Sequence, residues 1–409
     1  MRPGLGVARP YAAQPCPALD RFSAGLADPE GSSLMLRIAF HANQLSERGG
    51  EVALYDYCHY NEVLLGNRSV VFYPRKATSN DASVLARFAQ SFELVAYDHF
   101  AEVDMHIQAM KLDLFYAIKG GEIDGIVSRV VPSMIHAVFA QSPFEIHGSA
   151  YAFVSEWLSG KCSAGLVPAV PHVVHAPCLG LLANLRLELG IPQSAVVLGG
   201  YGGSESFDLD FVRDRVIPEA LARRQDFYFV FMNFRPFIRH PRVFFLERST
   251  NPSVKYALIA ACDAMLHARR QGESFGLACA EFSMQGKPVF TYGLSPDRHH
   301  LHVLGSSAVV YRDGEQLLRQ LMAFQPSQAP LLEAEGYRKY TPEHVMERFD
   351  RHLIHPALRR GALGLRLTLF TLPWRRPFSP LLRGLFWQLQ IAVRRLGTLA
   401  RFDLTAGRR

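Results

Sequence analysis

The chain has 409 residues, of which 49% are hydrophobic and 20% charged, which is the balance of a folded globular protein and excludes a disordered chain. Because this length exceeds that of one ordinary domain, we expect two domains with appendages. The six scattered cysteines form neither a C-x-x-C pair nor a cluster with histidine at zinc spacing, so we expect no disulfide framework and no structural metal. This cysteine usage indicates a reducing, cytoplasmic compartment.

The positive charge is concentrated at the C-terminus. The net charge is +7, but residues 355–409 contain eleven arginines, no lysine and a single acid, Asp403, which gives this segment a charge of +10. The rest of the chain therefore carries −3, and it has no basic strip with interleaved aromatic residues. We expect no nucleic-acid partner.

Residues 1–34 are rich in proline, glycine and alanine without helical or strand periodicity, which predicts a disordered leader. Met35 directly precedes the first strand pattern and is a candidate start of translation, which the mass of the native protein would test. No apolar run reaches the length of a membrane-spanning helix, and the N-terminus lacks the apolar segment of a secretory signal.

Apolar periodicity over residues 35–177 predicts a first domain in which strands alternate with helices. The expected strands cover residues 36–40, 69–73, 92–97, 112–118, 132–139 and 150–154, and the expected helices include 51–65 and 82–91. A glycine turn, Gly49–Gly50, separates the first strand from the first helix. Such an alternation makes a parallel, doubly wound sheet.

A second alternating series occupies residues 178–345. Its expected strands cover residues 195–198, 227–232, 243–246, 264–267 and 288–291, and its expected helices cover 210–223, 252–261 and 275–285. The predicted fold class is therefore α/β, with two Rossmann-like domains facing a cleft, and ligands in such sheets bind beyond the carboxyl ends of the strands.

The most informative segment covers residues 262–290. A strand ends at a loop that carries Glu273, Gly276 opens a helix, and Glu281 lies on that helix eight residues after the first glutamate. The amino end of a helix offers free amides and a positive dipole to a diphosphate, and a carboxylate two turns in can accept hydrogen bonds from ribose hydroxyls. Two glutamates at this spacing alone indicate a solvated face, but the flanking strand, the Ser-Phe-Gly turn and Gly-Lys-Pro-Val favour a nucleotide-sugar site.

This segment resembles the donor site of retaining GT-B glycosyltransferases of the family-four type (glycosyl transferases group 1). In that family a strand, a G-E-x-F-G-L turn, a second glutamate and a G-K-P-V strand follow in the same order. The resemblance implies that Glu273 lies near the hydroxyls of the donor sugar and that Glu281 holds the ribose. It implies equally that Ser274, Phe275 and Gly276 form the turn that faces the donor.

The resemblance extends over roughly residues 36–340. Gly49 and Gly50 match the glycine loop that such enzymes place against the donor from the first domain, and residues 154–158, Val-Ser-Glu-Trp-Leu, are similar to the family's V-S-E-x-L segment. The resemblance implies the GT-B fold, a nucleotide-sugar donor substrate with no further cofactor, and no metal site, because such enzymes lack an Asp-x-Asp motif.

One feature of the family is missing. The first strand of the second domain is usually followed by a Gly-Arg pair and a nearby lysine that bind the diphosphate, whereas residues 199–203 read Gly-Gly-Tyr-Gly-Gly. The amides of Gly202 and Gly203 could form an anion-binding nest instead. Alternatively Arg269, which we prefer to Arg270, could supply the charge from the end of the neighbouring strand. Pairing of this arginine with a local acid is an equally weighted alternative.

Histidines provide further candidates. His136 ends a first-domain strand where this fold often offers a histidine to the donor or acceptor, although a histidine in an apolar run is more often a core residue. His147 and His41 are the next candidates. The cluster at residues 298–302, Arg-His-His-Leu-His, is interpreted as a loop at the cleft edge rather than a metal site.

Residues 346–409 form a basic tail in which arginines alternate with leucine, phenylalanine and tryptophan. This pattern predicts amphipathic helices that contact an anionic membrane surface, which would place the protein on the inner face of the membrane. The alternative is that part of the tail packs back across the first domain with its arginines solvated.

The expected function is transfer of a sugar from a nucleoside-diphosphate sugar to a hydroxyl of a glycan or lipid-linked glycan, with retention at the anomeric carbon. Glu273, His136 and Arg269 are the candidate catalytic residues. Two alternatives stay open: an inactive GT-B module that binds a glycan or a partner, and a nucleotide-sugar epimerase of the same fold. The missing arginine supports the inactive module, whereas a membrane-binding tail is not needed by an epimerase.

Overall fold

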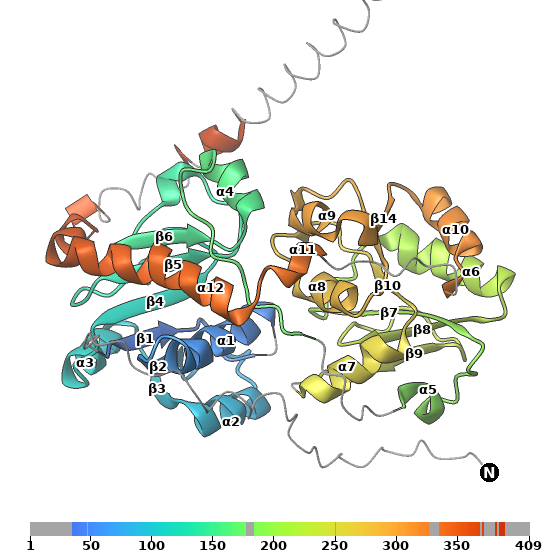
Figure 1. Ribbon diagram of the computed structural model, residues 1–409, viewed down its shortest axis with the longest axis horizontal. Coiled ribbons are helices and arrows are strands. Elements are labelled where there is room, and N and C mark those ends of the chain that lie inside the picture. Colours follow the sequence, from blue (N-terminus) through green and yellow to red (C-terminus); the bar gives the residue numbers. More distant parts are fainter. Residues whose placement is uncertain are drawn as a thin grey trace, which may run out of the picture.

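The computed structural model describes residues 35–46, 48–176, 184–249, 251–326, 335–368, 370–371, 381–382 and 384–388. The predicted leader at residues 1–34, the predicted domain boundary at 177 and much of the predicted tail lie outside them. Figure 1 shows two lobes side by side, each built on one sheet with helices on its faces.

The N-terminal domain contains one parallel sheet in the order β3-β2-β1-β4-β5-β6. Its strands are β1 (Arg37–His41), β2 (Arg68–Pro74), β3 (Glu93–Tyr97), β4 (Leu114–Lys119), β5 (Ser133–Ala137) and β6 (Ala150–Phe153). In β1, Ile38 lies opposite Ser69 on one side and Leu114 on the other. The central strands are buried on both faces, as expected where helices cover a parallel sheet.

Helices join these strands, and two of them, α2 and α4, begin at side-chain caps. The helical elements are α1 (Gly49–Val63), α2 (Ala82–Ser91), α3 (Ala101–Ala109), η1 (Pro143–Glu145) and α4 (Glu156–Ser163). The Asp81 carboxylate accepts from the first amides of α2, and the Ser155 hydroxyl accepts from the Leu158 amide of α4. The predicted V-S-E-x-L segment therefore marks the start of α4.

The C-terminal domain repeats this topology, with a parallel sheet in the order β14-β12-β10-β7-β8-β9. Its strands are β7 (Val196–Tyr201), β8 (Phe227–Met232), β9 (Val243–Leu246), β10 (Ala264–His267), β12 (Val289–Tyr292) and β14 (Ala308–Tyr311). A separate two-stranded sheet pairs β11 (Gly272–Glu273) with β13 (Asp297–Arg298). Its helical elements are α5 (Leu185–Glu188), η2 (Val212–Val216), α6 (Ile217–Arg223), α7 (Pro252–Ala261), α8 (Leu277–Met284), α9 (His299–Leu304), η3 (Gly305–Ser307), α10 (Gly314–Ala323) and α11 (Glu335–Arg338).

Both sheets reverse their strand order at the same topological point. In the first sheet this point lies between β1 and β4, which end at His41 and Lys119, and in the second between β7 and β10, which end at Tyr201 and His267. Ligands of open α/β sheets bind beyond the carboxyl ends of the strands at such a point. The predicted fold class, two doubly wound domains, is confirmed.

The C-terminal helix returns to the first domain (Figure 1). It comprises α12 (Pro342–Phe349), the π-helical turn η5 (Asp350–Ile354) and a helical run over residues 355–368 and 370–371, so the predicted start of the tail at residue 346 lies inside a helix. The Phe349 ring stacks on Tyr57 at 5.2 Å between centroids, and Arg348 donates to the Glu156 carboxylate at 2.6 Å. Within the described residues, no helix is both long and apolar enough to cross a membrane.

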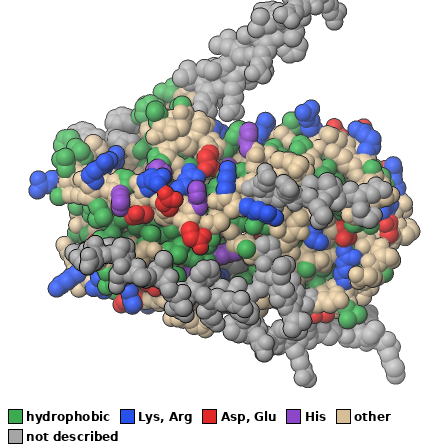
Figure 2. Space-filling view, viewed as in Figure 1, with side chains coloured by type: hydrophobic (Ala, Val, Ile, Leu, Met, Phe, Trp, Pro, Cys, Tyr) green, Lys and Arg blue, Asp and Glu red, His purple; other side chains and the backbone are tan. Residues whose placement is uncertain are grey.

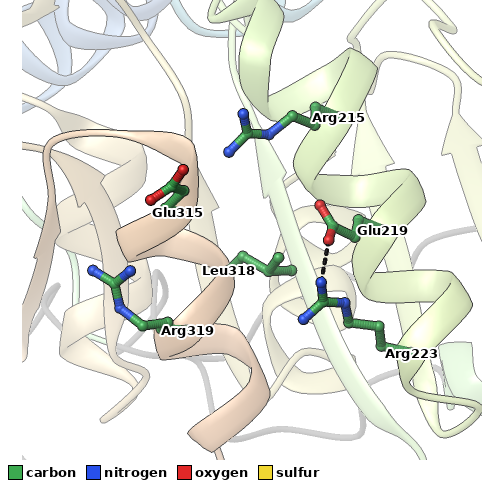
Figure 3. Close-up of a pocket in the computed structure, with 6 residues that line it drawn as sticks. All are labelled: Arg215, Glu219, Arg223, Glu315, Leu318 and Arg319. Carbon is green, nitrogen blue, oxygen red and sulfur yellow. Dashed lines mark hydrogen bonds and ion pairs between the residues drawn. The ribbon is translucent and has the colours of Figure 1, made fainter.

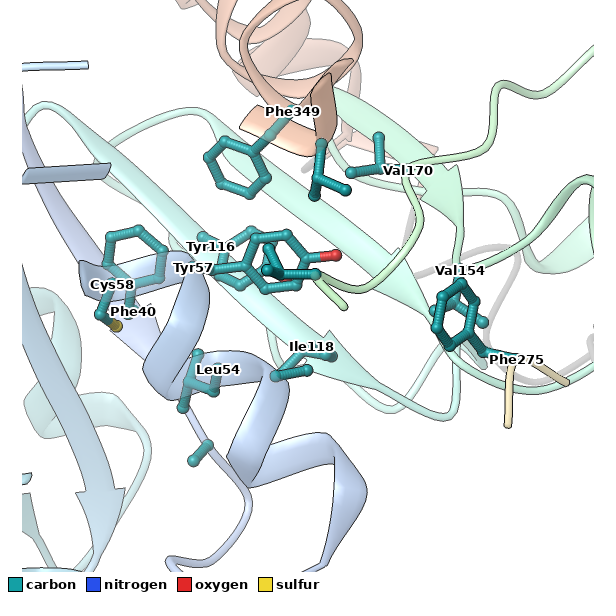
Figure 4. Close-up of a cluster of buried hydrophobic side chains, with 14 of the residues drawn as sticks. Phe40, Leu54, Tyr57, Cys58, Tyr116, Ile118, Val154, Val170, Phe275 and Phe349 are labelled. Atoms are coloured by element: carbon teal, nitrogen blue, oxygen red, sulfur yellow. The ribbon is translucent and has the colours of Figure 1, made fainter. Parts of the chain in front are cut away.

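The hydrophobic core connects the two domains. One cluster runs from the faces of the first sheet, through Phe275, to one face of the second sheet, and Phe349 closes it from the returning helix (Figure 4). The Phe275 ring packs edge-on against His172 of the first domain at 5.1 Å. A second cluster fills the other face of the second sheet. The two domains are therefore joined by packed side chains at the amino end of α8.

Candidate active site

The amino end of α8 lies at the switch point of the second sheet. Gly276 precedes it with a φ of +91°, a left-handed conformation that favours glycine, and no side chain caps the helix. A Cβ at Gly276 would lie 3.1 Å from the Cβ of Glu273. The first amides of the helix have no partner within the helix. The turn at residues 274–276 therefore holds Glu273 tightly against an uncapped helix end.

Glu273 accepts hydrogen bonds from two residues at the end of β10. Arg269 Nη1 donates to Oε2 at 2.9 Å, and His267 Nε2 donates to Oε1 at 3.1 Å. Burial by itself would raise the pKa of Glu273, but the charge of Arg269 and the hydrogen bond from His267 outweigh it and lower the pKa to about 2. The side chain is thus a carboxylate throughout the physiological range.

A hydrogen-bond chain behind Glu273 fixes the His267 ring. Because His267 Nε2 donates to the carboxylate, its Nδ1 accepts from the Thr291 hydroxyl, 2.9 Å away. The same hydroxyl oxygen lies 3.0 Å from His300 Nε2, which donates to it. Burial, followed by the neighbouring His267, lowers the pKa of His300 to about 3. Both imidazoles therefore act as orienting groups for the carboxylate.

Arg269 forms an ion pair with Glu273, which is one of the two alternatives that the sequence analysis gave for this arginine. Its contact with Glu273 raises its pKa, and about a third of its side chain stays exposed. The preferred prediction, that Arg269 supplies the diphosphate charge, is untested by this geometry. Arg270 lies at the surface near Asp208 and Asp210.

Glu281 is the fifth residue of α8, at the start of its second turn, and is 6% exposed. Lys255 Nζ of α7 donates to its Oε1 at 2.5 Å, whereas Oε2 has no hydrogen-bond partner among the described residues. Burial, and after it the charge of Asp56 on α1, raises the pKa of Glu281. Burial lowers the pKa of Lys255 to about 8. Burial therefore favours the neutral forms of both Glu281 and Lys255. The ion pair between the two side chains favours their charged forms instead.

Lys255 is the site residue that the sequence analysis missed. Its ammonium group lies 5.8 Å from the centroid of the Tyr201 ring, at the end of β7, directly before Gly202. A cation thus stands beside the Tyr201 ring, one residue before the glycine turn in which the family's arginine is missing. No motif marks this residue, because its position depends on the packing of α7 near the carboxyl end of β7.

The first domain approaches this site through α1. A Cβ at Gly49 would lie 3.8 Å from the Leu277 side chain in the first turn of α8, and no atom lies within 4 Å of a Cβ at Gly50. Asp56, further along α1, pairs with His175 at 3.1 Å. Gly49 and Gly50 therefore form the first residues of α1 rather than a separate turn, and the structure brings this helix end and the amino end of α8 together.

The glycine turn of the second domain adjoins a pocket. The Gly202 carbonyl accepts from Asn233 Nδ2 at 2.8 Å, and the Gly203 carbonyl accepts from Ser206. The pocket, of about 420 Å³, lies at the ends of β8 and β9 and is lined by Ser204, Asn233, Phe234, Arg235, Pro236, Phe245, Leu246, Glu247 and Arg248. Arg248 reaches Asp81 of the first domain at 2.6 Å. This pocket thus lies on the side of the second domain that faces the first.

A second groove lies elsewhere on the same domain. It has a volume of about 470 Å³ and lies between α6 and α10, where Figure 3 shows its lining of Arg215, Glu219, Arg223, Glu315, Leu318 and Arg319. Arg223 pairs with Glu219 within it. None of the predicted site residues lines this groove.

His136 lies in the core of the first domain. Its Nε2 donates to the Val170 carbonyl at 2.8 Å, so its Nδ1 accepts from the Tyr116 hydroxyl at 2.8 Å. Burial lowers its pKa to about 4. His136 therefore matches the alternative given for it, a core histidine with both ring nitrogens bonded inside the domain, and its contact with the donor or acceptor stays a prediction.

The other two candidate histidines, His41 and His147, are also buried. His41 is buried with its Nε2 2.6 Å from the Tyr97 hydroxyl, and His147 Nδ1 lies 2.6 Å from the Glu145 carbonyl. Residues 299–304 form helix α9 rather than the expected loop, because His299 and His300 are buried against Phe275 and Thr291. In the part of the chain that the structure describes, no group of three His, Cys, Asp or Glu side chains could hold a metal ion.

Solved structures share this fold. A glycosyltransferase from Rickettsia africae aligns with a TM-score of 0.56 at 12% identity, over 83% of this chain and 98% of that chain. Anabaena HepE in complex with UDP and glucose aligns with a TM-score of 0.59 at 16% identity, over 77% and 98%. The UDP complex of Staphylococcus aureus MnaA aligns with a TM-score of 0.53 at 11% identity, over 78% and 96%.

These similarities define the class of fold. The chain has the GT-B fold, with two Rossmann-like domains and a C-terminal helix, and its neighbours include glycosyltransferases and UDP complexes. At these identities the likeness shows the fold alone, and the N-terminal domain of a Candida albicans trehalose-6-phosphate phosphatase shares it too. No protein-family model matches the chain, and no curated protein sequence is significantly similar to it.

Proposed function

We propose that this protein is a glycosyltransferase that moves a sugar from a nucleoside-diphosphate sugar to a hydroxyl of a glycan or lipid-linked glycan, with retention. The observation that carries the proposal is the placement of two glutamates around one uncapped helix end, with Glu273 in β11 just before α8 and Glu281 within α8. Glu273 is a carboxylate at the mouth of α8, and Glu281 has a buried oxygen without a partner among the described residues. UDP-glucose is the ligand of one structural neighbour, Anabaena HepE, which supports a donor of this class.

In this proposal the diphosphate lies at the amino end of α8. The uncapped amides of the first turn and the helix dipole stabilise the negative charge that develops on the departing diphosphate. The ammonium group of Lys255 lies beside the Tyr201 ring, one residue before the glycine turn. It supplies the positive charge that an arginine supplies in the family. This ammonium group has two further N–H bonds besides the one directed to Glu281.

The two carboxylates have separate roles. Glu281 Oε2 accepts from a ribose hydroxyl, which gives this buried oxygen the partner it lacks. Glu273 accepts hydrogen bonds from hydroxyls of the donor sugar. The hydrogen bonds that Arg269 and His267 donate to its carboxylate hold its orientation. The protein then acts mainly by positioning the acceptor hydroxyl and stabilising the leaving group.

A turnover assay tests this function. Purified protein is incubated with UDP- and GDP-sugars, with and without glycan acceptors, and release of free nucleoside diphosphate is measured. Release by the native chain and its loss in Arg269→Ala are expected, because the carboxylate of Glu273 is then left without its charged partner. Arg270→Ala, which removes an exposed neighbouring arginine, is the matched control and keeps activity.

Three outcomes separate the alternatives. Nucleotide binding without any turnover would indicate an inactive GT-B module. Interconversion of two nucleotide sugars without an acceptor would indicate an epimerase. Equal activity of the native chain and Arg269→Ala would contradict the proposed arrangement of the site.

A further inference from the structure

The C-terminal helix packs against the first domain through small residues. Along residues 355–371 its buried side chains are Ala357, which is 0% exposed, and Thr368, which is 7% exposed, with Gly364 on the same face. A Cβ at Gly364 would lie 3.5 Å from Ser149 Oγ, and Arg360 Nη1 donates to the Ser149 carbonyl at 2.8 Å. The helix therefore lies close against the domain in a fixed orientation.

Three large apolar residues of this helix face the solvent. Leu363, Leu367 and Phe370 follow one another at spacings of four and three, which places them on one face, and they are 68%, 56% and 72% exposed. An ordinary surface helix has the opposite arrangement, with its large apolar residues against the core. We call Leu363, Leu367 and Phe370 the outer face.

A second helical piece adds to the exposed apolar surface. Leu381 and Leu385, four residues apart, are 68% and 57% exposed. Trp387 anchors this piece, since its ring lies 5.9 Å from the Lys161 ammonium of α4. Figure 2 shows hydrophobic side chains exposed over the N-terminal domain, on the upper left of the molecule. Single exposed leucines need no explanation, whereas a row of them on one helix face does.

The charges beside the outer face are basic. Arg359 and Arg366 are exposed on the same helix, and residues 355–409 contain eleven arginines and one acid. A partner that covers this face must therefore accept apolar side chains and many positive charges together. A second copy of the chain would bring like charges together across a symmetric contact. An anionic lipid surface satisfies both requirements.

We propose that the outer face, with Leu381 and Leu385, docks onto an anionic membrane surface. The helix lies in the plane of the interface with its apolar side chains among the acyl chains and its arginines at the lipid phosphates. The packing of Gly364 and Thr368 against the first domain then fixes how the whole protein stands on the membrane. This proposal rests on the helix alone and does not depend on the nucleotide site.

Vesicle flotation of the full chain tests the proposal, with phosphatidylcholine vesicles that contain or lack 30% phosphatidylglycerol. The test variant is Leu363→Ser with Leu367→Ser and Phe370→Ser. The matched control replaces three exposed apolar residues outside the tail, Val63→Ser with Leu187→Ser and Leu294→Ser. Circular dichroism and thermal melting check that both variants stay folded.

The native chain and the control are expected to bind the anionic vesicles. The test variant is expected to bind roughly 100-fold more weakly, because it lacks the three apolar side chains that would be buried in the bilayer. Binding should weaken as NaCl rises, since salt screens the arginines. Equal binding by the test variant, or no binding by the native chain, would overturn the proposal. A dimer in sedimentation equilibrium that the test variant abolishes, without vesicle binding, would instead assign the outer face to a second copy.

Discussion

Lys255 has a pKa close enough to neutrality to make nucleotide binding depend on pH. Burial lowers its pKa to about 8, so the ammonium form dominates below pH 8 and the neutral amine above it. Since only the ammonium attracts a diphosphate, the affinity for UDP should be constant from pH 7 to about 7.5 and then fall by up to about tenfold per pH unit. Calorimetric titration between pH 7 and 9.5 measures this dependence.

Lys255→Met should bind UDP more weakly at pH 7 and lose the decline above pH 8. Lys287→Met removes a lysine that follows α8 and serves as the control. Its UDP affinity should depend on pH as that of the native chain does. A decline of the same size in Lys255→Met would show that another group titrates, and Lys255 would then not be the cation of the site.

At the residue scale, motif and packing gave different information. The sequence places Glu273 just before a helix and Glu281 within it, because the strand, turn and helix around them are local. It does not reveal Lys255, which precedes Glu281 by 26 residues and meets it only when α7 packs near α8. His136 illustrates the opposite limit. The apolar strand pattern around it locates the residue, but it does not say whether the ring nitrogens already have partners, which they do in the structure.

At the scale of elements, Gly276 controls the position of the amino end of α8. Gly276→Ala would place a Cβ 3.1 Å from Glu273 and 3.3 Å from His300, in a backbone conformation unfavourable for alanine. Gly286→Ala, just after the same helix, meets a similar backbone penalty at a φ of +69° but no atom within 4 Å. Both variants should lose about 1–2 kcal/mol of unfolding free energy. Only Gly276→Ala should also lose UDP affinity, by tenfold or more.

Denaturant unfolding and UDP titration of the two variants test this difference. Equal UDP affinities would show that the turn at Gly276 does not shape the site. A loss of affinity in both would point to a general loosening of α8 instead.

Most elements were predictable because their patterns are local. The bounds of α2, α7, β8, β9 and β10 agree with the predicted ranges. The predicted helix 210–223 is confirmed as a helical segment, but residues 212–216 within it form a π-helical turn before α6, because Pro218 has no N–H to donate in a continuous α-helix. The return of the C-terminal helix to the first domain is the alternative that the sequence analysis left open for the tail. The individual contacts, such as that of Phe349 with Tyr57, follow no local pattern, because the two residues are almost 300 positions apart.

At the scale of the whole molecule, buried histidines should make stability fall steeply in mild acid. Burial lowers the pKa values of five of them in the described structure: His41, His136, His172, His299 and His300. Below pH 6.5 the unfolded chain binds protons at these residues and the folded chain does not, so stability decreases as pH falls. Burial also raises the pKa values of Glu51 and Glu281, which has the opposite effect in the same range.

Because the histidines outnumber these glutamates, the unfolded chain binds the larger number of protons in this range, and the free energy of unfolding should fall as the pH drops from 6.5 to 5. Denaturant unfolding at pH 7.5, 6.5 and 5.5 measures it, and the free energy of unfolding should drop mainly over the second interval. A constant value over this range would contradict the burial of these histidines in neutral form.

Titration calorimetry with UDP and GDP tests the nucleotide site most directly, with the native chain and Glu281→Gln compared at pH 7. One of the two nucleotides should bind with a stoichiometry of one. The variant should bind it more weakly by about 1–3 kcal/mol, because a buried carboxylate that accepts from ribose is replaced by a neutral amide. Absence of binding by the native chain, or equal affinity in a folded Glu281→Gln variant, would contradict a nucleotide site on α8.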